Sequence, residues 1–134
     1  MGHLIAGGLH VPFYLEHELR ARHPRGVAAR LRPYERYYYS TEHEDDQPPF
    51  PITLFVVDTE EVEDTYVSTA ARMTRMSLPI LVSCIPVLST TGILGPSWRP
   101  LWEPESPRLH LSALANYQWD SLYHRMRHRP VGGR

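Results

Sequence analysis

The chain has no lysine, a single cysteine and no apolar run long enough to cross a membrane. Its 134 residues include 14 basic ones, and every one of these is arginine. Cys84 has no second cysteine with which to form a disulfide within the chain. The longest apolar stretch, residues 78–88, is interrupted by Pro79 and Pro86 and falls far short of a membrane-spanning helix. These absences favour a cytoplasmic protein without a membrane partner, and they exclude any mechanism that needs a lysine of this chain.

What the chain does contain predicts one domain followed by a tail. It is 42% hydrophobic with a formal net charge of -1, which suits a single ordinary core. The arginine-only usage has two possible sources. One is a GC-rich genome, and the other is selection for bidentate phosphate contacts, which guanidinium makes and ammonium does not. We expect an α/β domain over residues 1–107, followed by a C-terminal helix and a basic tail over residues 108–134.

The N-terminal half predicts a hairpin followed by a helix. Residues 4–6 and 9–18 lie on either side of a Gly-Gly dipeptide, which suits a hairpin turn. Pro24 is well placed to begin an amphipathic helix, because its fixed φ suits the first helical position. Pro33 lies inside that helix and is expected to kink it or split it in two.

Two continuous apolar runs follow, at residues 52–57 and 79–85, and they predict strands covered on both faces. Asp58 or Thr59 can cap an intervening helix with acidic residues at its start and basic residues at its end. A strand, helix, strand order of this length implies parallel pairing of the two strands. The expected fold class is therefore α/β, with a small mixed or parallel sheet and flanking helices, and a last helix is expected from Leu111.

Two carboxylates stand out on the second predicted strand. Side chains alternate between the faces of a strand, so Glu16 and Glu18 share one face, about 7 Å apart along the chain. Carboxylates at that spacing can both reach one divalent cation, or a phosphodiester with its metal. The alternative interpretation is a half-exposed strand with solvated acids.

The helix after this strand predicts a phosphate-binding surface. Several arginines fall away from the apolar stripe of that helix or precede its start, so they should face solvent. Arginines spaced along one element contact phosphates without reading sequence. The residues concerned are Arg20, Arg22, Arg25, Arg32 and Arg36.

Five ordered blocks of the chain resemble the replication-relaxation family of actinobacterial plasmids and integrative elements. They lie within residues 2–115, and they are FYLEHELRAR at 13–22, ARLRPYERYY at 29–38, LFVVD at 54–58, PILV at 79–82 and GPSWRP at 95–100. Members of that family typically join an N-terminal winged-helix part to a domain similar to PD-(D/E)xK nucleases. The resemblance implies that only the second part is present here, as a partial restriction-endonuclease-like domain truncated at its N-terminus.

The resemblance also assigns roles to particular residues. Glu16 matches the metal-binding Glu of the nuclease pattern, whereas Glu18 stands where a lysine is expected. Arg30 and Tyr34 fall on the helical Gln-x-x-x-Tyr motif, with arginine in place of glutamine. The Asp of the preceding strand is missing, because Met1 and Gly2 occupy its place. The implied catalytic residues are thus Glu16, Glu18, Arg30 and Tyr34, with Glu16 as the metal ligand.

The function that this resemblance implies is a catalytically impaired, nuclease-like domain that binds the DNA phosphate backbone. Its cofactor would be Mg²⁺ or Mn²⁺, with no nucleotide or organic cofactor. One alternative is a weak metal-dependent nicking nuclease that uses Glu16, Glu18 and Arg30. The other is a non-enzymatic module in which Tyr37, Tyr39 and the tail bind other replication or conjugation proteins.

Overall fold

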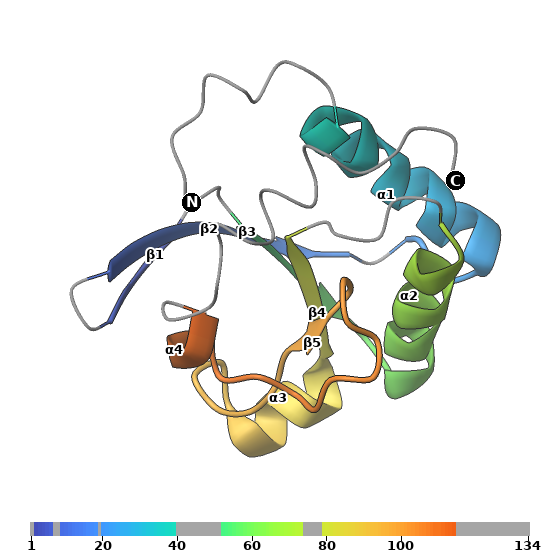
Figure 1. Ribbon diagram of the computed structural model, residues 1–134. Helices are drawn as coiled ribbons and strands as arrows, with labels where there is room; N and C mark the ends of the chain where they lie inside the picture. Colours follow the sequence, from blue (N-terminus) through green and yellow to red (C-terminus); the bar gives the residue numbers. More distant parts are fainter. Residues whose placement is uncertain (1, 7–8, 19, 40–51, 74–78, 115–134) are drawn as a thin grey trace.

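The computed structural model describes residues 2–6, 9–18, 20–39, 52–73 and 79–114, which form an α/β fold around a mixed five-stranded sheet (Figure 1). The basic tail and the part of the last predicted helix beyond residue 114 lie outside these ranges. The strands are β1 (Gly2–Ala6), β2 (Leu9–His17), β3 (Ile52–Val57), β4 (Ile80–Cys84) and β5 (Arg99–Pro100). The helices are α1 (Pro24–Tyr39), α2 (Glu60–Arg72), α3 (Ile85–Thr91) and α4 (Leu111–Leu114).

The strands lie in the sheet in their sequence order, β1-β2-β3-β4-β5. β1 and β2 are antiparallel, and their register pairs Ala6 with Leu9, so the predicted hairpin is confirmed. β3 and β4 are parallel, as the strand, helix, strand order predicted, and β2 is also parallel to β3. β5 pairs antiparallel with β4 through two residues. The sequence did not predict β5, because a strand of two residues that ends in a proline carries no local strand pattern.

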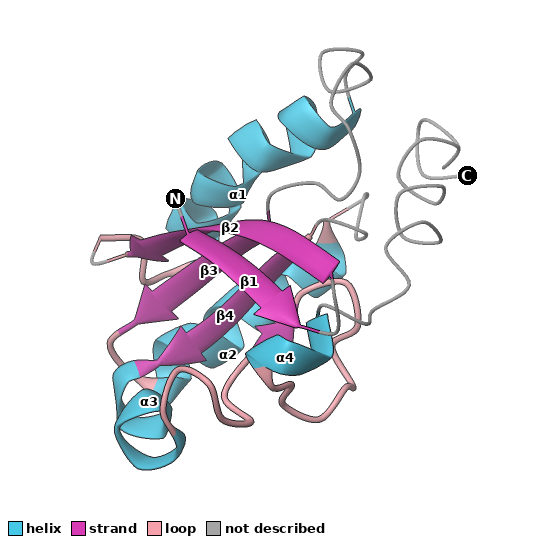
Figure 2. Ribbon diagram, turned by 90° about the vertical axis from the view of Figure 1, so that its left-hand side faces the viewer, coloured by secondary structure: helices cyan, strands magenta, loops and turns pink. Residues whose placement is uncertain are grey.

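The central strand β3 has a covered face on each side, which explains why its sequence is continuously apolar. Phe55 and Val57 pack into a cluster with side chains of α1 and α2. Leu54 and Val56, on the opposite face, pack with Trp98 and with residues of α4. Figure 2 shows α4 in front of the sheet and α1 and α2 behind it, so the sheet separates two apolar clusters.

Helix α1 begins at Pro24, as its sequence predicted, and packs through an apolar stripe. Val27 and Leu31 are fully buried, and Tyr34 packs against the same cluster. The helix continues through Pro33, so it is not split in two. Pro33 is exposed, on a side of the helix where the apolar stripe does not run.

Helix α2 is capped by Thr59, whose Oγ1 accepts a hydrogen bond of 3.2 Å from the backbone amide of Val62. The sequence left Asp58 and Thr59 open as caps, and the structure selects the second. Acidic residues in the first turn and Arg72 in the last complement the helix dipole at both ends.

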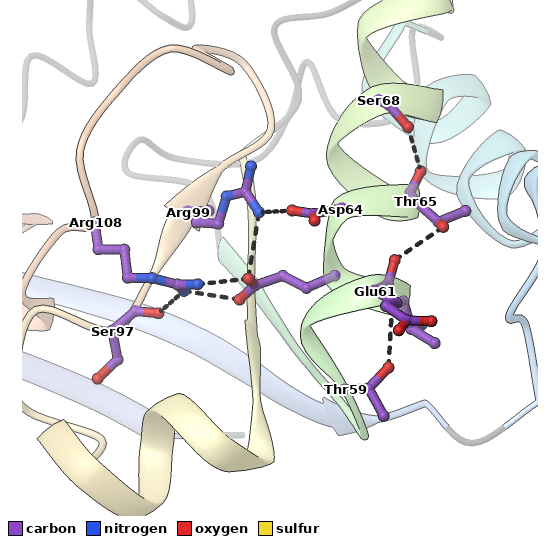
Figure 3. Close-up of polar contacts among 10 residues, drawn as sticks. Thr59, Glu61, Asp64, Thr65, Ser68, Ser97, Arg99 and Arg108 are labelled. Carbon is purple, nitrogen blue, oxygen red and sulfur yellow. Dashed lines mark hydrogen bonds and ion pairs between the residues drawn. The ribbon is translucent and has the colours of Figure 1, made fainter.

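An ion cluster fastens the segment after β5 to α2. Arg108 donates two hydrogen bonds to the buried carboxylate of Glu63, and Arg99 donates to both Glu63 and Asp64. Figure 3 shows Arg99 and Arg108 directed towards the helix from the facing segment. Arg108, the first residue of the predicted C-terminal segment, is therefore joined to α2.

None of the helices in the described ranges combines the length and apolar composition that crossing a bilayer requires.

Candidate functional site

The guanidinium of Arg30 lies between the two carboxylates that the sequence singled out. Its Nη2 donates to Glu16 Oε2 at 2.6 Å, and its Nε donates to Glu18 Oε2, also at 2.6 Å. Glu16 belongs to β2, Glu18 follows the end of that strand, and Arg30 comes from the second turn of α1. Both carboxylates therefore lie on the α1 side of the sheet; the alternation along the strand predicted that they share a face, but not which helix covers it.

Two aromatic side chains, Tyr34 and Phe55, contact Arg30. Tyr34 lies one turn after Arg30, and its hydroxyl donates to Glu16 Oε2 at 2.6 Å. The ring of Tyr34 meets the ring of Phe55 edge-on, with centroids 5.6 Å apart. The guanidinium carbon of Arg30 is 5.2 Å from the centroid of Phe55 and 5.5 Å from that of Tyr34. We call Glu16, Glu18, Arg30 and Tyr34 the carboxylate–arginine network.

Glu18 is the most enclosed carboxylate of this network, with 11% of its side chain exposed. Its Oε1 accepts hydrogen bonds from the backbone amides of Arg20, at 2.9 Å, and Ala21, at 3.1 Å. Burial alone raises the pKa of Glu18, but the hydrogen bonds from Arg30 and from these two amides outweigh it. The net effect lowers the pKa, so Glu18 is held as a carboxylate.

Arg30 and Tyr34, the two members of the network that come from α1, are held in their protonated forms. Burial lowers the pKa of Arg30, but the carboxylate of Glu18 more than offsets this, and the guanidinium stays charged. Burial and the hydrogen bond to Glu16 raise the pKa of Tyr34 to about 12. At neutral pH neither Arg30 nor Tyr34 can therefore accept a proton, and neither can act as a general base.

A second polar cluster lies beside the network, at the carboxyl ends of β2 and β3. His17 Nε2 is 3.4 Å from Asp58 Oδ1, and Arg22 forms an ion pair with the other oxygen of Asp58. Sequence reasoning treated Asp58 only as a possible helix cap and Arg22 only as a phosphate ligand. The carboxyl ends of adjacent parallel strands lie at the same edge of a sheet. That rule could have placed His17, at the end of β2, close to Asp58, which follows β3.

The sequence also missed Tyr66 of α2. Its side chain is fully buried, and its hydroxyl has no hydrogen-bond partner within the described part of the chain. Burial, and then the nearby charge of Glu18, raise its pKa. Tyr66 belongs to the buried apolar cluster, and the sequence gave no sign of its proximity to the carboxylates.

Three arginines form a row along the exposed side of α1. Arg25, Arg32 and Arg36 are spaced seven and four residues apart, which places them on one helix face, opposite the buried stripe. All three are exposed, and none forms an ion pair with another residue of the described ranges. We call these three residues the α1 arginine row. Arg20, which precedes the helix, is exposed as well.

The residues of the network do not fit a divalent cation. A metal would need the carboxylate oxygens that the guanidinium of Arg30 already occupies, and that guanidinium carries a fixed positive charge. Elsewhere in the described ranges, no group of three or more histidine, cysteine or acidic side chains is arranged to hold a metal ion. The four residues predicted to be catalytic are therefore brought together, but around an arginine.

No family model, curated protein or solved structure matches this chain.

Proposed function

We propose that this chain is a DNA-binding, nuclease-like domain of the replication-relaxation type, which contacts the phosphate backbone and does not itself cleave DNA. The observation that carries the proposal is the α1 arginine row. Exposed arginines along one face of a helix offer fixed positive charge and paired donors to phosphate oxygens.

The dimensions of the row suit a nucleic-acid backbone. Arg25 and Arg36 are eleven positions apart, which corresponds to about 16 Å along the helix axis. That length matches about five successive phosphates of one strand, measured along the duplex axis. The formal net charge of the whole chain is only -1, so attraction to DNA would come from this local row and not from the overall charge.

The carboxylate–arginine network supports the non-catalytic half of the proposal. Arg30 pairs with both carboxylates, so its charge is directed inward and is not part of the row. The same two pairs tie α1 to the end of β2, which fixes the helix that carries the row. A nuclease of the resembled type would need a metal at Glu16 and a lysine two residues later, where Glu18 is found.

The order of the elements supports the nuclease-like half. In the resembled pattern the metal-binding Glu lies on the second of two consecutive strands, and the following helix carries the conserved motif. Here Glu16 lies on β2, which follows β1, and Arg30 and Tyr34 lie on α1. The element order thus agrees with the expected placement of all three residues.

Fluorescence anisotropy with a labelled duplex, measured at a series of salt concentrations, tests the proposal. The test variant replaces Arg25, Arg32 and Arg36 together with glutamine. Arg72→Gln is the matched control, because Arg72 is exposed at the end of a different helix. We expect affinity of the parent protein to fall steeply with salt, and the slope of log K against log salt to decrease by about 3 in the triple variant.

Binding that is independent of salt, or equal losses in the triple variant and in Arg72→Gln, would contradict the proposal. The same samples, incubated with Mn²⁺, are scored for nicking of supercoiled plasmid. Nicking by the parent that is lost in Glu16→Gln would replace the proposal with the nuclease alternative.

A further inference from the structure

The place where the resembled nucleases hold a metal contains, in this chain, a cation that belongs to the protein itself. We propose that the guanidinium of Arg30 substitutes for a divalent cation between Glu16 and Glu18, so that the pair excludes metal while Arg30 is present and accepts it when Arg30 is removed. This inference does not depend on DNA binding.

Most of the carboxylate oxygens of Glu16 and Glu18 already accept hydrogen bonds. Three of the four oxygens have donors: Glu16 Oε2 has Arg30 and Tyr34, Glu18 Oε2 has Arg30, and Glu18 Oε1 has two backbone amides. Mg²⁺ needs oxygens at about 2.0 to 2.1 Å in a near-ideal octahedron. It could take those positions only by displacing the arginine nitrogens, which lie 2.6 Å from both carboxylates.

The positive charge of Arg30 also opposes the binding of a metal ion by the two carboxylates. The two carboxylates contribute -2 and Arg30 contributes +1, and the arginine cannot lose its proton to make room for a metal. A dication would therefore be repelled at short range by a charge that stays in place. Without Arg30, the two carboxylates would keep the hydrogen bonds from Tyr34 and from two backbone amides but would lose their neighbouring positive charge, which is the situation that favours binding a cation.

The side chain of Arg30 is also held in this position by its surroundings. Its side chain is about two-thirds buried, and its guanidinium lies 5.2 Å from the ring centroid of Phe55. Tyr34 also donates to Glu16, from the next turn of the same helix. Leaving the carboxylates would cost Arg30 both its ion pairs and its contact with these rings.

Mn²⁺ binding, followed by electron paramagnetic resonance of the free ion, tests the inference directly. The proteins compared are the parent, Arg30→Gln, and Arg30→Gln combined with Glu16→Gln and Glu18→Gln. We expect Arg30→Gln to gain one weak Mn²⁺ site, with a Kd of about 10⁻⁴ to 10⁻³ M, the range of the weakest protein Ca²⁺ sites. The triple variant should bind no more Mn²⁺ than the parent, and any binding by acidic residues elsewhere is common to all three proteins.

Thermal unfolding provides an independent readout. Mn²⁺ should raise the Tm of Arg30→Gln and leave that of the parent and the triple variant unchanged, because a ligand stabilises only the folded state to which it binds. Two results would overturn the inference: Mn²⁺ binding by the parent that is lost in Glu16→Gln, or no gain of binding in Arg30→Gln.

A second variant keeps the test decisive if Arg30→Gln does not fold. Arg30→Lys retains the positive charge and loses the forked geometry. We expect Arg30→Lys to exclude Mn²⁺ as the parent does. Mn²⁺ binding by Arg30→Lys that depends on Glu16 would contradict the inference that the positive charge of residue 30 takes the place of the metal ion.

Discussion

Arg108 donates two hydrogen bonds, of 2.5 and 2.7 Å, to the carboxylate of Glu63, which lies 45 positions earlier in the chain. The Glu63 side chain is completely buried, while that of Arg108 is about one-quarter exposed. The same arginine donates to the backbone carbonyl of Ser97 at 2.9 Å (Figure 3). One side chain thus joins α2 to the segment that follows β5 and supplies most of the charge compensation that the buried carboxylate needs.

Removing Arg108 should strongly destabilise the fold. In Arg108→Met the carboxylate of Glu63 would remain buried with only the longer contact from Arg99, at 3.3 Å. Leaving one member of a buried ion pair without its partner costs about 3 to 5 kcal/mol. Urea unfolding followed by circular dichroism measures the free energy of unfolding.

Arg99→Met is the matched control, because its shorter bond is to Asp64, whose side chain is 70% exposed. We expect a loss of about 1 kcal/mol or less for this variant. Replacing Glu63 and Arg108 together with leucine should be milder than Arg108→Met alone, since no buried charge remains. Equal losses for Arg99→Met and Arg108→Met would show that the buried pair is not the principal attachment.

Tyr34→Phe should lower the free energy of unfolding by about 1 kcal/mol, because it removes a hydrogen bond to a carboxylate and keeps the ring against Phe55. Tyr14→Phe is the control, since Tyr14 is exposed on the neighbouring strand and should change stability by less than about 0.5 kcal/mol. Denaturant midpoints for the two variants give the comparison. A Tyr34→Phe protein as stable as Tyr14→Phe would mean that this hydrogen bond contributes nothing.

The lowered pKa of Glu18 predicts sensitivity to acid. Burial opposes this shift, and the hydrogen bonds from Arg30, Arg20 and Ala21 produce it, so the folded pKa lies below the ordinary value of 4.5. A carboxylate whose pKa is lowered by folding contributes stability above its unfolded pKa and loses it as the pH falls through the folded pKa. The contribution of Glu18 should therefore be intact at pH 7 and should decline below about pH 4.5.

Unfolding measured from pH 7 to pH 3 tests this prediction in the parent and in Glu18→Gln. The difference in stability between the two proteins should shrink as the pH falls. Glu105→Gln, which removes an exposed carboxylate, serves as the control and should change stability at pH 7 by less than about 0.5 kcal/mol. A difference for Glu18→Gln that stays constant to pH 3 would exclude a lowered pKa.

Thr59→Ala should reduce stability by about 1 kcal/mol, because the Oγ1 of Thr59 satisfies the otherwise unpaired amide of Val62 at the start of α2. Ser68→Ala lies on the exposed side of the same helix and should be neutral or slightly stabilising. Thermal unfolding separates the two expectations. A Thr59→Ala protein with an unchanged Tm would show that water replaces the cap without loss.

Elements with a strong local pattern of apolar residues could be predicted from the sequence. The continuous apolar run of β3 indicated a central strand, and the stripe of Val27 and Leu31 indicated which side of α1 is buried. β5 could not be predicted, because a two-residue strand beside Pro100 has no periodicity of its own and depends on pairing with β4. Local sequence patterns therefore predicted the α/β class and the parallel pairing of β3 with β4, but not the complete sheet.

The candidate site divides in the same way. Alternation along a strand was enough to place Glu16 and Glu18 on one face, and helical spacing was enough to place Arg25, Arg32 and Arg36 on another. Those patterns follow from backbone geometry over a few residues. The sequence by itself thus determined which side chains are available, on which faces of which elements.

Only the tertiary structure decided the partners of those side chains. Arg30 could have faced solvent with the other arginines, and its pairing with both carboxylates arises because α1 packs across the end of β2. The pairing of Glu63 with Arg108 likewise needs α2 and the segment after β5 to meet over a shared core. Such contacts join residues 12 to 45 positions apart, and their energies depend on burial and geometry that no local pattern records.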